Sequence, residues 1–505
     1  MTAMLADVIR GVPSAELRGD DVEIEDAEHD SRAVRPGVLF CAVPGATVDG
    51  HEHAPAAVEA GARALLVERW LDVDVPQIRV PSVRAAMGPA AAIVHGHPSR
   101  ELTVVGTTGT NGKTTICYLL EGAFAAGGLG TGVIGTIETR MKGVRQPGVR
   151  TTPEGTDLQR LLRRMRDREV DAVAMEVSSH GLDLHRVDGT RFAVAVFTNL
   201  SQDHLDWHAD MEAYFHAKAR LFTRRLAERG VVFLDGPWAR RLLEVAEIPL
   251  TTVGRDADAD VRILEPSVDI DGGRCQLVGP LVGTDPVTVV TGAPGAFNLA
   301  NAVTAVVAAV LAGVSWEDAV AGVAACAGAP GRFERVVDIA EGVDAATVLV
   351  DYAHTPDAVA QVVETLRSLL EPGARLAIVI GCGGDRDRQK RGPMGEAAAG
   401  ADLAVLTSDN PRSEDPMAIL ETMAAGATDA VAAGAPAEVV VEPDRRRAIA
   451  EALGRTRAGD VVVVAGKGHE TTQQLRDGTI PFDDRQVVAS LLHAGTGPAD
   501  PGGGA

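Results

Sequence analysis

The stretch "LTVVGTTGTNGKTTICYLLEGAF" occupies residues 102–124 and decides the fold of the middle of the chain. Its first residues form a short apolar run, which is typical of a buried strand, and its last residues have helical spacing. Between the two lies a loop with glycines at 106, 109 and 112 that ends in Lys-Thr-Thr. Strand, glycine-rich loop and helix in this order predict backbone N–H groups that converge on an anion at a helix N-terminus.

This loop departs from the common phosphate-loop pattern, because Thr107 stands five residues before Gly112, where that pattern has a glycine. Lys113 would neutralise phosphate charge, and Thr114 would offer its hydroxyl to Mg²⁺. The alternative is a glycine-rich turn that merely ends a strand. The lysine and the two threonines favour a nucleotide site. They leave open whether the phosphoryl group moves something, switches something or makes a bond.

Length and composition limit the classes of protein that fit. The 505 residues allow about three domains at roughly 100–200 residues each. No stretch approaches the ~20 uninterrupted apolar residues of a membrane helix, and the first residues do not resemble a secretory signal. Five scattered cysteines without a CxxC pair fit a reducing cytoplasm. A net charge of −22 argues against a nucleic-acid partner.

The hydrophobic pattern predicts an α/β protein with three domains. Residues 1–100, with strand-like runs at 37–45 and 62–68, form a small N-terminal α/β domain. Residues 101–330 form a central P-loop ATPase domain in which apolar runs alternate with helical stretches, which indicates a mostly parallel sheet covered on both faces. Its strands are expected at 102–106, 171–177, 192–198 and 229–235.

Residues 331–493 repeat this alternation and predict a C-terminal, Rossmann-like doubly wound domain. Within it, 355–370 is an expected helix with Thr355 as N-cap and Pro356 at its first position. The apolar face of that helix would carry Val359, Val362, Val363, Leu366 and Leu370. Residues 494–505, rich in glycine and proline, are expected to be a disordered tail.

Two polar side chains follow neighbouring predicted strands of the central domain. Glu176 ends one strand, and His204 lies in "TNLSQDHLDWH" (198–208) after the next. Ligands of doubly wound sheets gather beyond the carboxyl ends of the strands. Taken alone, each is an ordinary polar loop residue. Beside the phosphate loop they favour a second set of Mg²⁺ ligands.

Together, several motifs resemble the Mur ligase family, the ATP-dependent amide-forming enzymes of peptidoglycan synthesis. They occur in this order: "TGTNGKTT" (108–115), "EVSSHGL" (176–182), "TNLSQDHLDWH", "YFHAKARLF" (214–222), "GAFNLANA" (295–302), "GRFERV" (331–336) and "DYAHTPDA" (351–358). The resemblance implies one domain for a UDP-sugar, one for ATP and one for an incoming amino acid. It also implies transfer of the γ-phosphate to a substrate carboxylate, which gives an acyl phosphate that an amine attacks.

The resemblance implies ATP and Mg²⁺ as cofactors and gives catalytic roles to Lys113, Lys218 and His204. Lys218 matches a lysine that the family carries as a carbamate, N6-carboxylysine, and this would hold Mg²⁺ together with Thr114, Glu176 and His204. Carbamylation needs a neutral amine, so a lowered lysine pKa is expected. Without its flanking motif, Lys218 would be an exposed helical lysine. The implied ATP-binding residues are Gly109, Thr110, Asn111, Gly112, Lys113, Thr114, Thr115, Asn301, Arg332 and Asp351.

Three later motifs, "GCGGDRD" (381–387), "TSDNPR" (407–412) and "GKGHE" (466–470), resemble the family members that add meso-diaminopimelate to the D-Glu of UDP-N-acetylmuramoyl-L-Ala-D-Glu. The planar fork of Arg412 suits the distal carboxylate that lysine lacks. The local alternative is a plain capped turn, in which Ser413 with Glu414, Asp415 and Pro416 forms a helix start. The implied diaminopimelate-binding residues are Arg386, Asp409, Asn410, Pro411, Arg412, Gly466 and Glu470.

For the sugar-peptide acceptor, the resemblance implies Ser31 on the uridine side and Thr151, Thr152, Ser178 and Arg186 on the peptide side. Leu184 stands where family members often have Gln, so one substrate hydrogen bond is in question.

Three rival functions remain open at this point: a P-loop motor ATPase such as a DNA translocase, a sister ligase of the folylpolyglutamate or D-Ala-D-Ala-adding type, and a non-catalytic binding protein. We expect a cytoplasmic monomer that takes small-molecule substrates and neither binds nucleic acid nor inserts into a membrane.

Overall fold

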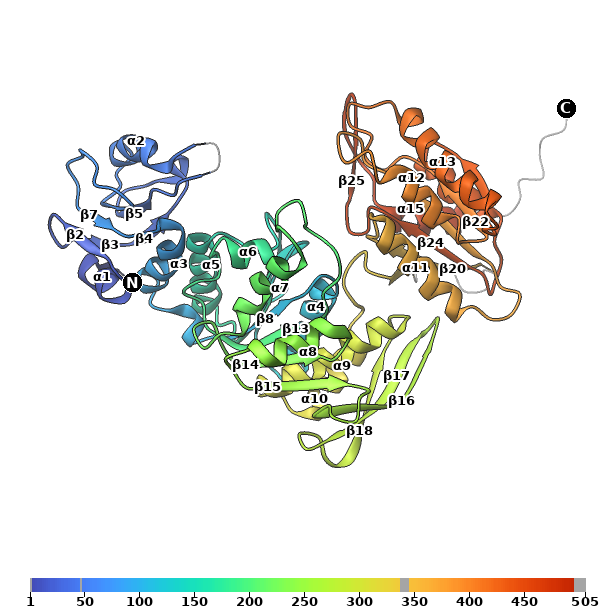
Figure 1. Cartoon of the computed structure of the whole chain (residues 1–505), viewed down its shortest axis with the longest axis horizontal. Helices are drawn as coiled ribbons and strands as arrows, with labels where there is room; N and C mark the ends of the chain where they lie inside the picture. Colours follow the sequence, from blue (N-terminus) through green and yellow to red (C-terminus); the bar gives the residue numbers. More distant parts are fainter. Residues whose placement is uncertain (1, 46–47, 337–344, 495–505) are drawn as a thin grey trace. The chain divides into compact units, whose positions relative to one another are not determined.

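The computed structural model describes residues 2–45, 48–336 and 345–494 (Figure 1). The chain divides into two compact units. The first comprises Met1–Pro266, Cys275–Val290 and Ala300–Cys326; the second comprises Ser267–Arg274, Thr291–Leu299 and Ala327–Ala505. The expected disordered tail lies outside the described residues apart from Ala494, the last residue of a helix. The domain boundaries at 100, 330 and 493 stay a prediction.

The N-terminal segment folds around a sheet of order β2-β7-β6-β5-β4 and a small pair β1-β3. The predicted runs at 37–45 and 62–68 contain β5 and β6, whose side chains are buried throughout. The strands are β1 (Ala3–Met4), β2 (Glu16–Arg18), β3 (Glu23–Ile24), β4 (Asp26–Glu28), β5 (Val38–Cys41), β6 (Ala64–Val67) and β7 (Gln77–Arg79). The helices are α1 (Leu5–Gly11), α2 (Ala54–Glu59) and α3 (Val83–Val94).

The central segment forms a sheet of order β11-β10-β9-β12-β8-β13-β14-β15-β16-β17-β18. Neighbours from β9 to β16 pair in parallel, as expected for apolar runs that alternate with helices. Its strands are β8 (Thr103–Thr108), β9 (Thr131–Ile134), β10 (Glu138–Met141), β11 (Val144–Pro147), β12 (Ala172–Glu176), β13 (Phe192–Phe197), β14 (Ala227–Phe233), β15 (Leu250–Gly254), β16 (Val261–Asp269), β17 (Gly272–Gly279) and β18 (Gly283–Thr291). Its helices are α4 (Lys113–Ala126), α5 (Gly155–Asp167), α6 (Ser179–Asp183), α7 (Met211–Ala219), α8 (Gly236–Val245), α9 (Ala296–Leu311) and α10 (Trp316–Ala325).

The C-terminal segment has a sheet of order β19-β20-β24-β21-β22-β23, parallel except at the short edge strand β19, and a hairpin β25-β26. Its strands are β19 (Glu334–Arg335), β20 (Thr347–Asp351), β21 (Leu376–Ile380), β22 (Leu403–Leu406), β23 (Glu438–Val441), β24 (Val461–Ala465), β25 (Thr472–Leu475) and β26 (Gly478–Pro481). Its helices are α11 (Pro356–Leu369), α12 (Arg391–Ala398), α13 (Pro416–Ala432), α14 (Arg445–Gly454) and α15 (Asp484–Ala494).

Helices cover both faces of this C-terminal sheet. Alternate strand residues pack in one apolar cluster with α11, α12 and α13, and the remaining ones pack in a second cluster with α14 and α15. The predicted doubly wound domain is therefore confirmed, and with it the three-part α/β fold class. Among the described residues, no helix has the length and apolar character that crossing a membrane requires.

Candidate active site

The phosphate loop joins β8 to α4, and its conformation requires glycine at two positions. Gly109 has φ +146° and Gly112 has φ +86°, backbone angles that residues other than glycine rarely adopt. A Cβ on Gly109 would also collide with the Thr198 hydroxyl, and one on Gly112 would collide with the Asn301 carboxamide. The loop backbone is thus packed between the end of β13 and helix α9, which places Asn301 directly over the expected nucleotide loop.

Hydrogen bonds to Asn199, in the segment after β13, and to Tyr214 on α7 fix the polar residues of the loop. The backbone N–H of Thr110 donates to the Asn199 carbonyl (2.9 Å), and that of Asn111 donates to the Asn199 side chain (3.0 Å). The Thr110 hydroxyl lies 3.2 Å from that of Tyr214. Thr115 lies in the first turn of α4. The loop is therefore ordered by the protein's own contacts.

Two lysines meet at one carbonyl oxygen of this loop. Lys113 Nζ donates to Gly109 O (2.9 Å) and Thr110 O (2.7 Å), and Lys218 Nζ donates to Gly109 O (2.8 Å). Lys218, on α7, is only 1% exposed and lies 4.5 Å from the centre of the Tyr214 ring. Burial, reinforced by the charge of Lys113, holds the pKa of Lys218 well below its ordinary value. The expected lowered pKa is borne out, and the alternative of an exposed helical lysine is wrong.

Thr114 and Glu176, both expected to be Mg²⁺ ligands, are hydrogen-bonded to each other. Glu176 ends β12, next to β8 in the sheet, and its Oε2 accepts from the Thr114 hydroxyl at 3.0 Å. The Thr136 backbone N–H and hydroxyl donate to the same carboxylate (2.8 and 3.2 Å). A hydroxyl beside a buried carboxylate offers the oxygen ligands that Mg²⁺ prefers, so these residues fit that ion.

His204 lies among the aromatic rings of His180 and Tyr214. Its ring is 4.8 Å from that of His180 and 6.0 Å from that of Tyr214, between centroids. Burial lowers the pKa of His204; nearby Asp203 opposes this effect, and the positive charges of Lys113 and Lys218 reinforce it. A neutral imidazole is the form that binds a metal ion.

The expected peptide-side residues converge on the backbone of Glu176. The Thr152 hydroxyl donates to Glu176 O (3.0 Å) and lies 3.2 Å from the Ser178 hydroxyl. Ser178 Oγ in turn caps α6 by accepting from Gly181 N. The Thr151 hydroxyl lies 2.9 Å from that of Thr136, which contacts the Glu176 carboxylate. The residues expected to bind the acceptor peptide therefore share one hydrogen-bonded cluster with Thr136 and Glu176.

Glu154 organises the arginines of this cluster, a role that motif reasoning missed. It is 6% exposed, and its carboxylate pairs with Arg84 (2.7 Å), Arg150 (2.5 Å) and Arg186 (3.0 Å). Arg186 also donates to Thr152 O (3.2 Å). One carboxylate among three guanidinium groups leaves an excess of positive charge. The charged residues near Glu154 in the sequence could not predict this cluster of three arginines, because Arg84 comes from α3 of the N-terminal segment.

The uridine-side residue Ser31 begins a short 3₁₀ turn after β4. Asp30 caps that turn by accepting from Arg32 N (3.0 Å). Leu184, where the family often has Gln, follows α6 as its C-cap and brings no polar side chain to the cluster.

In the second unit, Arg332 and Asp351 lie together. The Arg332 guanidinium carbon is 4.5 Å from the centre of the Tyr352 ring. Asp351 ends β20, and its carboxylate accepts from the backbone N–H groups of Phe333 (2.9 Å) and Ala353 (2.8 Å). Burial raises the pKa of Asp351, and the neighbouring Arg332 charge opposes that rise. The two ATP residues expected from this segment thus form one local group.

Asp409, Asn410 and Glu470, which belong to the expected amino-acid site, lie around a buried lysine that motif reasoning did not assign. Lys467 is fully buried, and its Nζ donates to Asn410 Oδ1 (3.2 Å) and Glu470 Oε2 (3.1 Å) and lies 3.7 Å from Asp409 Oδ1. Asn410 Nδ2 donates to Glu470 (2.9 Å). Burial raises the pKa of Asp409, and within the described chain its Oδ1 has no hydrogen-bond partner. Such a carboxylate suits an incoming ammonium group.

Arg412 and Arg386 both lie close to Gly383. A Cβ built there would be 3.0 Å from Arg412 Nη1 and 3.8 Å from Arg386 Cγ. Arg412, with φ +53°, donates from Nε to Gln474 Oε1 (2.9 Å) and from Nη1 to Gly384 O (2.7 Å). Its guanidinium is therefore held in a fixed plane.

Pro411 and Gly466 contribute backbone rather than side chains to this group. The Pro411 carbonyl lies where a Cβ on Gly384 would collide with it. Gly466 has φ +106°, and a Cβ there would be 3.9 Å from Asp409 Oδ2. Glycine at 466 therefore allows the turn and leaves room beside the Asp409 carboxylate.

The expected helix start at residues 413–416 is confirmed. The helix after "DNPR" begins at Pro416, and Asp415 caps it by accepting from Met417 N (3.0 Å). Ser413 is not itself the cap, and its hydroxyl donates to Asp385 (2.7 Å).

Comparison with known proteins bears on the whole chain. Family models match at residues 23–95 (Mur ligase family, catalytic domain), 107–309 (Mur ligase middle domain) and 331–468 (Mur ligase, glutamate ligase domain). UDP-N-acetylmuramoyl-L-alanyl-D-glutamate–2,6-diaminopimelate ligase of Streptomyces avermitilis is 47% identical, over 96% of this chain and 97% of its own.

Solved structures agree with this comparison. One of a UDP-N-acetylmuramoyl-L-alanyl-D-glutamate–2,6-diaminopimelate ligase is 32% identical with TM-score 0.73, covering 99% of this chain and 100% of its own. MurF ligase from Thermotoga maritima, solved in complex with ADP, is 19% identical with TM-score 0.58, covering 93% of this chain and 97% of its own, and shares the fold.

Proposed function

Because the chain belongs to the Mur ligase family, we propose that it joins meso-diaminopimelate to the D-Glu carboxylate of UDP-N-acetylmuramoyl-L-Ala-D-Glu at the expense of ATP. The observation that supports this most is the cluster at the phosphate loop, where Thr114, Glu176 and Lys218 lie around the same short backbone stretch. The full-length likeness to diaminopimelate ligases supports the choice of substrates.

The chain's own residues account for activation of the carboxylate. Backbone N–H groups of the loop and Lys113 bind the phosphates, so that Lys113 exchanges its contacts with loop carbonyls for phosphate oxygens. The cluster around Thr152 and Arg186 orients the acceptor carboxylate in line for phosphoryl transfer. Thr114, Glu176 and His204 would hold Mg²⁺, which neutralises the charge of the two anions brought together.

Lys218 is proposed to act as a carbamate, which would complete the Mg²⁺ ligands. Burial and the lowered pKa favour the neutral amine that reacts with carbon dioxide. A carbon-13 NMR spectrum of enzyme equilibrated with labelled bicarbonate should contain a carbamate signal that Lys218→Ala lacks. Identical spectra for the two proteins would contradict the carbamate.

The choice of amino acid is assigned to the second unit. The guanidinium of Arg412, held in its plane by Gln474 and Gly384, pairs with the distal carboxylate of diaminopimelate. The Asp409 carboxylate receives its ammonium group. Lysine would leave the guanidinium unpaired, so the site rejects it strongly. Sister ligases that take other amino acids are the second candidate, supported by their shared fold alone.

The test is phosphate release with UDP-N-acetylmuramoyl-L-Ala-D-Glu and a panel of amino acids. Meso-diaminopimelate should support turnover, whereas lysine, glutamate and D-Ala-D-Ala should not. Arg412→Ala should lose most of the preference for diaminopimelate over lysine. Equal use of diaminopimelate by Arg412→Ala and wild type would refute the assignment.

The enzyme is further proposed to work in the cytoplasm as a monomer, where ATP and UDP-sugars are available to it. Light scattering of the purified protein should give the mass of one chain, with and without substrates. A stable dimer would contradict this part of the proposal.

A further inference from the structure

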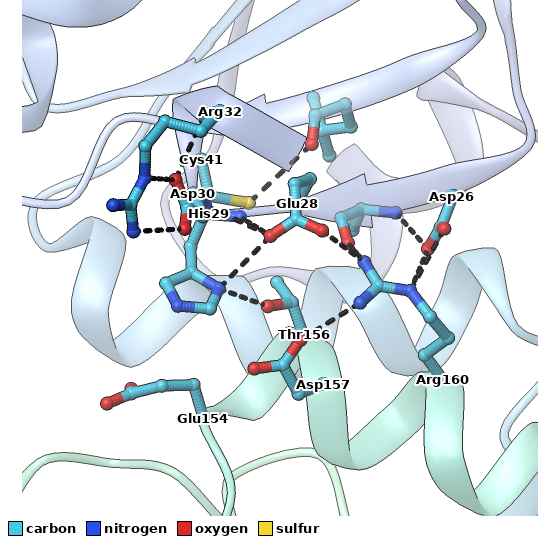
Figure 2. A network of polar contacts seen from close by, with 12 residues as sticks. Asp26, Glu28, His29, Asp30, Arg32, Cys41, Glu154, Thr156, Asp157 and Arg160 are labelled. Atoms are coloured by element: carbon cyan, nitrogen blue, oxygen red, sulfur yellow. Dashed lines mark hydrogen bonds and ion pairs between the residues drawn. The ribbon is translucent and has the colours of Figure 1, made fainter. Parts of the chain in front are cut away.

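Arg160, on helix α5 of the central segment, contacts strand β4 of the N-terminal segment (Figure 2). Its Nε donates to both oxygens of Asp26 (3.1 and 3.0 Å), and its Nη2 donates to Ala27 O (2.6 Å) and Glu28 Oε2 (2.9 Å). Nη1 donates to Asp157 on its own helix (2.9 Å). One guanidinium therefore joins α5 to each residue of β4.

The two carboxylates that accept hydrogen bonds from Arg160 are buried and ionised. Asp26 is 4% and Glu28 6% exposed. Burial would raise the pKa of Glu28, but hydrogen bonds from His29 and Asp30 and the charge of Arg160 outweigh it and lower the pKa to about 2. Burial would likewise raise the pKa of Asp26, but His95 and Arg160 outweigh it and lower that pKa, so both carboxylates are ionised at neutral pH. Removing the partly buried Arg160 would leave two buried charges without compensation, which is costly.

The contact lies between the two ends of the expected acceptor site. Glu28 Oε1 accepts from the backbone N–H groups of His29 (2.8 Å) and Asp30 (3.0 Å), which lead into the turn with Ser31. A second link joins His29 Nδ1 to the hydroxyl of Thr156 on α5 (2.8 Å; Figure 2). Helix α5 directly follows the segment with Thr151 and Thr152. Arg160 thus connects the uridine turn to the peptide-binding segment.

The same cluster also has the composition of a metal site, because Glu28, His29 and Asp157 offer ligand atoms within 4.8 Å of one another. Its carboxylate oxygens, however, already accept hydrogen bonds from Arg160 and from backbone N–H groups (Figure 2). Arg160 supplies the positive charge that an ion would bring. The observations therefore favour a set of ion pairs that joins α5 to β4 over a site for a metal cation.

We propose that Arg160 is a positioning residue that sets the separation between the uridine turn and the peptide segment, so that the acceptor binds to both at once. A ligand that spans two subsites gains affinity when their spacing matches its length, and it loses this gain when the spacing is loose. Each fragment alone would bind as before. The inference rests on the proposed function, because it needs an acceptor with a nucleotide at one end and a peptide at the other.

The experiment compares Arg160→Met, Arg160→Lys and the control Arg163→Met with wild type. Arg163 lies on the same helix but pairs with Asp167 within that helix (2.7 Å). Calorimetry gives the Kd of UDP and of UDP-N-acetylmuramoyl-L-Ala-D-Glu, and steady-state kinetics give kcat and each KM. Thermal unfolding shows whether each variant is folded.

For Arg160→Met we expect the Kd and KM of the whole acceptor to rise at least ~10-fold. Binding to two subsites at once can raise affinity by ~10²–10⁴-fold, and the variant should lose part of that gain. The Kd of UDP, the KM of ATP and kcat at saturating acceptor should stay within about twofold of wild type. Arg160→Lys should recover part of the acceptor affinity, because it keeps the charge, and Arg163→Met should match wild type.

Two results would overturn the proposal: UDP and whole acceptor weakened by the same factor, or neither weakened in a folded variant. If Arg160→Met unfolds, Arg160→Lys gives the same comparison of the two ligands. Wild-type ligation tests the proposed function separately. A wild type that binds UDP but ligates no amino acid removes that function and this inference together, whereas normal wild-type ligation with unchanged variants removes the inference alone.

Discussion

Lys467→Met removes the only cation that directly contacts the Asn410–Glu470 pair among the described residues. In the wild type, Lys467 Nζ lies 3.1 Å from Glu470 Oε2, 3.2 Å from Asn410 Oδ1 and 3.7 Å from Asp409 Oδ1. Methionine fills nearly the same volume without charge or donor. The variant therefore isolates the electrostatic contribution of Lys467 from its packing.

The cost follows from the exposure of the partners. Removing one member of a buried ion pair costs about 3–5 kcal/mol, because the remaining charge is left without compensation. The Lys467 side chain is 0% exposed, but those of Asp409 and Glu470 are 13% and 35% exposed. Water can partly solvate both carboxylates, so the lower end, about 3 kcal/mol, is expected. For a domain of this size, that lowers Tm by about 6–12 °C.

Differential scanning calorimetry of the whole enzyme measures this shift, with Arg455→Met as the control. Arg455 forms exposed ion pairs with Glu438 and Glu451 in the same segment, and such pairs contribute about 0–1 kcal/mol. The lower-temperature transition of Lys467→Met should therefore fall well below that of Arg455→Met, and the KM for diaminopimelate should rise. Equal transition temperatures for the two variants would refute the reasoning.

Three further outcomes are expected. Thr355→Ala should destabilise the second unit by about 1 kcal/mol in urea titrations, because Thr355 Oγ1 accepts from Ala358 N at the start of α11; Thr355→Ser should retain most of that stability. The contribution of Glu28, whose pKa is lowered from 4.5 to about 2, is complete above pH 4.5 and is lost as the pH falls toward 2. Acid unfolding of Glu28→Gln should thus be less steep over that range than that of wild type. Glu154→Gln should raise the KM for the sugar-peptide and leave that for ATP unchanged, as initial rates would show, since Glu154 holds Arg186 but touches no residue of the phosphate loop.

Sequence periodicity predicted the strands and helices whose position follows from their own apolar pattern. The parallel strands β8, β12 and β13 lie where continuous apolar runs predicted them. Helix α11 has the predicted cap and buries Val359, Val362, Val363 and Leu366. Leu370 follows the helix as its C-cap and is only partly buried, because the helix ends one residue earlier.

The roles of Glu154, Arg160 and Lys467 could not be predicted, because each of them also has partners in distant parts of the chain. Arg160 and Asp26 are 134 residues apart, and Lys467 and Asn410 are 57 apart. Charged residues on a helix or loop are usually solvated, so nothing local distinguishes these three. The stretch 413–416 indicated a helix start, but the sequence could not decide which of its residues is the cap: Ser413 has the right residue type, but its hydroxyl donates to Asp385.

The most direct test of the account measures phosphate release from ATP while one substrate at a time is omitted. With all three substrates present, one phosphate should be released per amide formed, and almost none should be released without the UDP-N-acetylmuramoyl-dipeptide. ATP cleavage at the full rate without that acceptor would contradict a site built to activate its carboxylate.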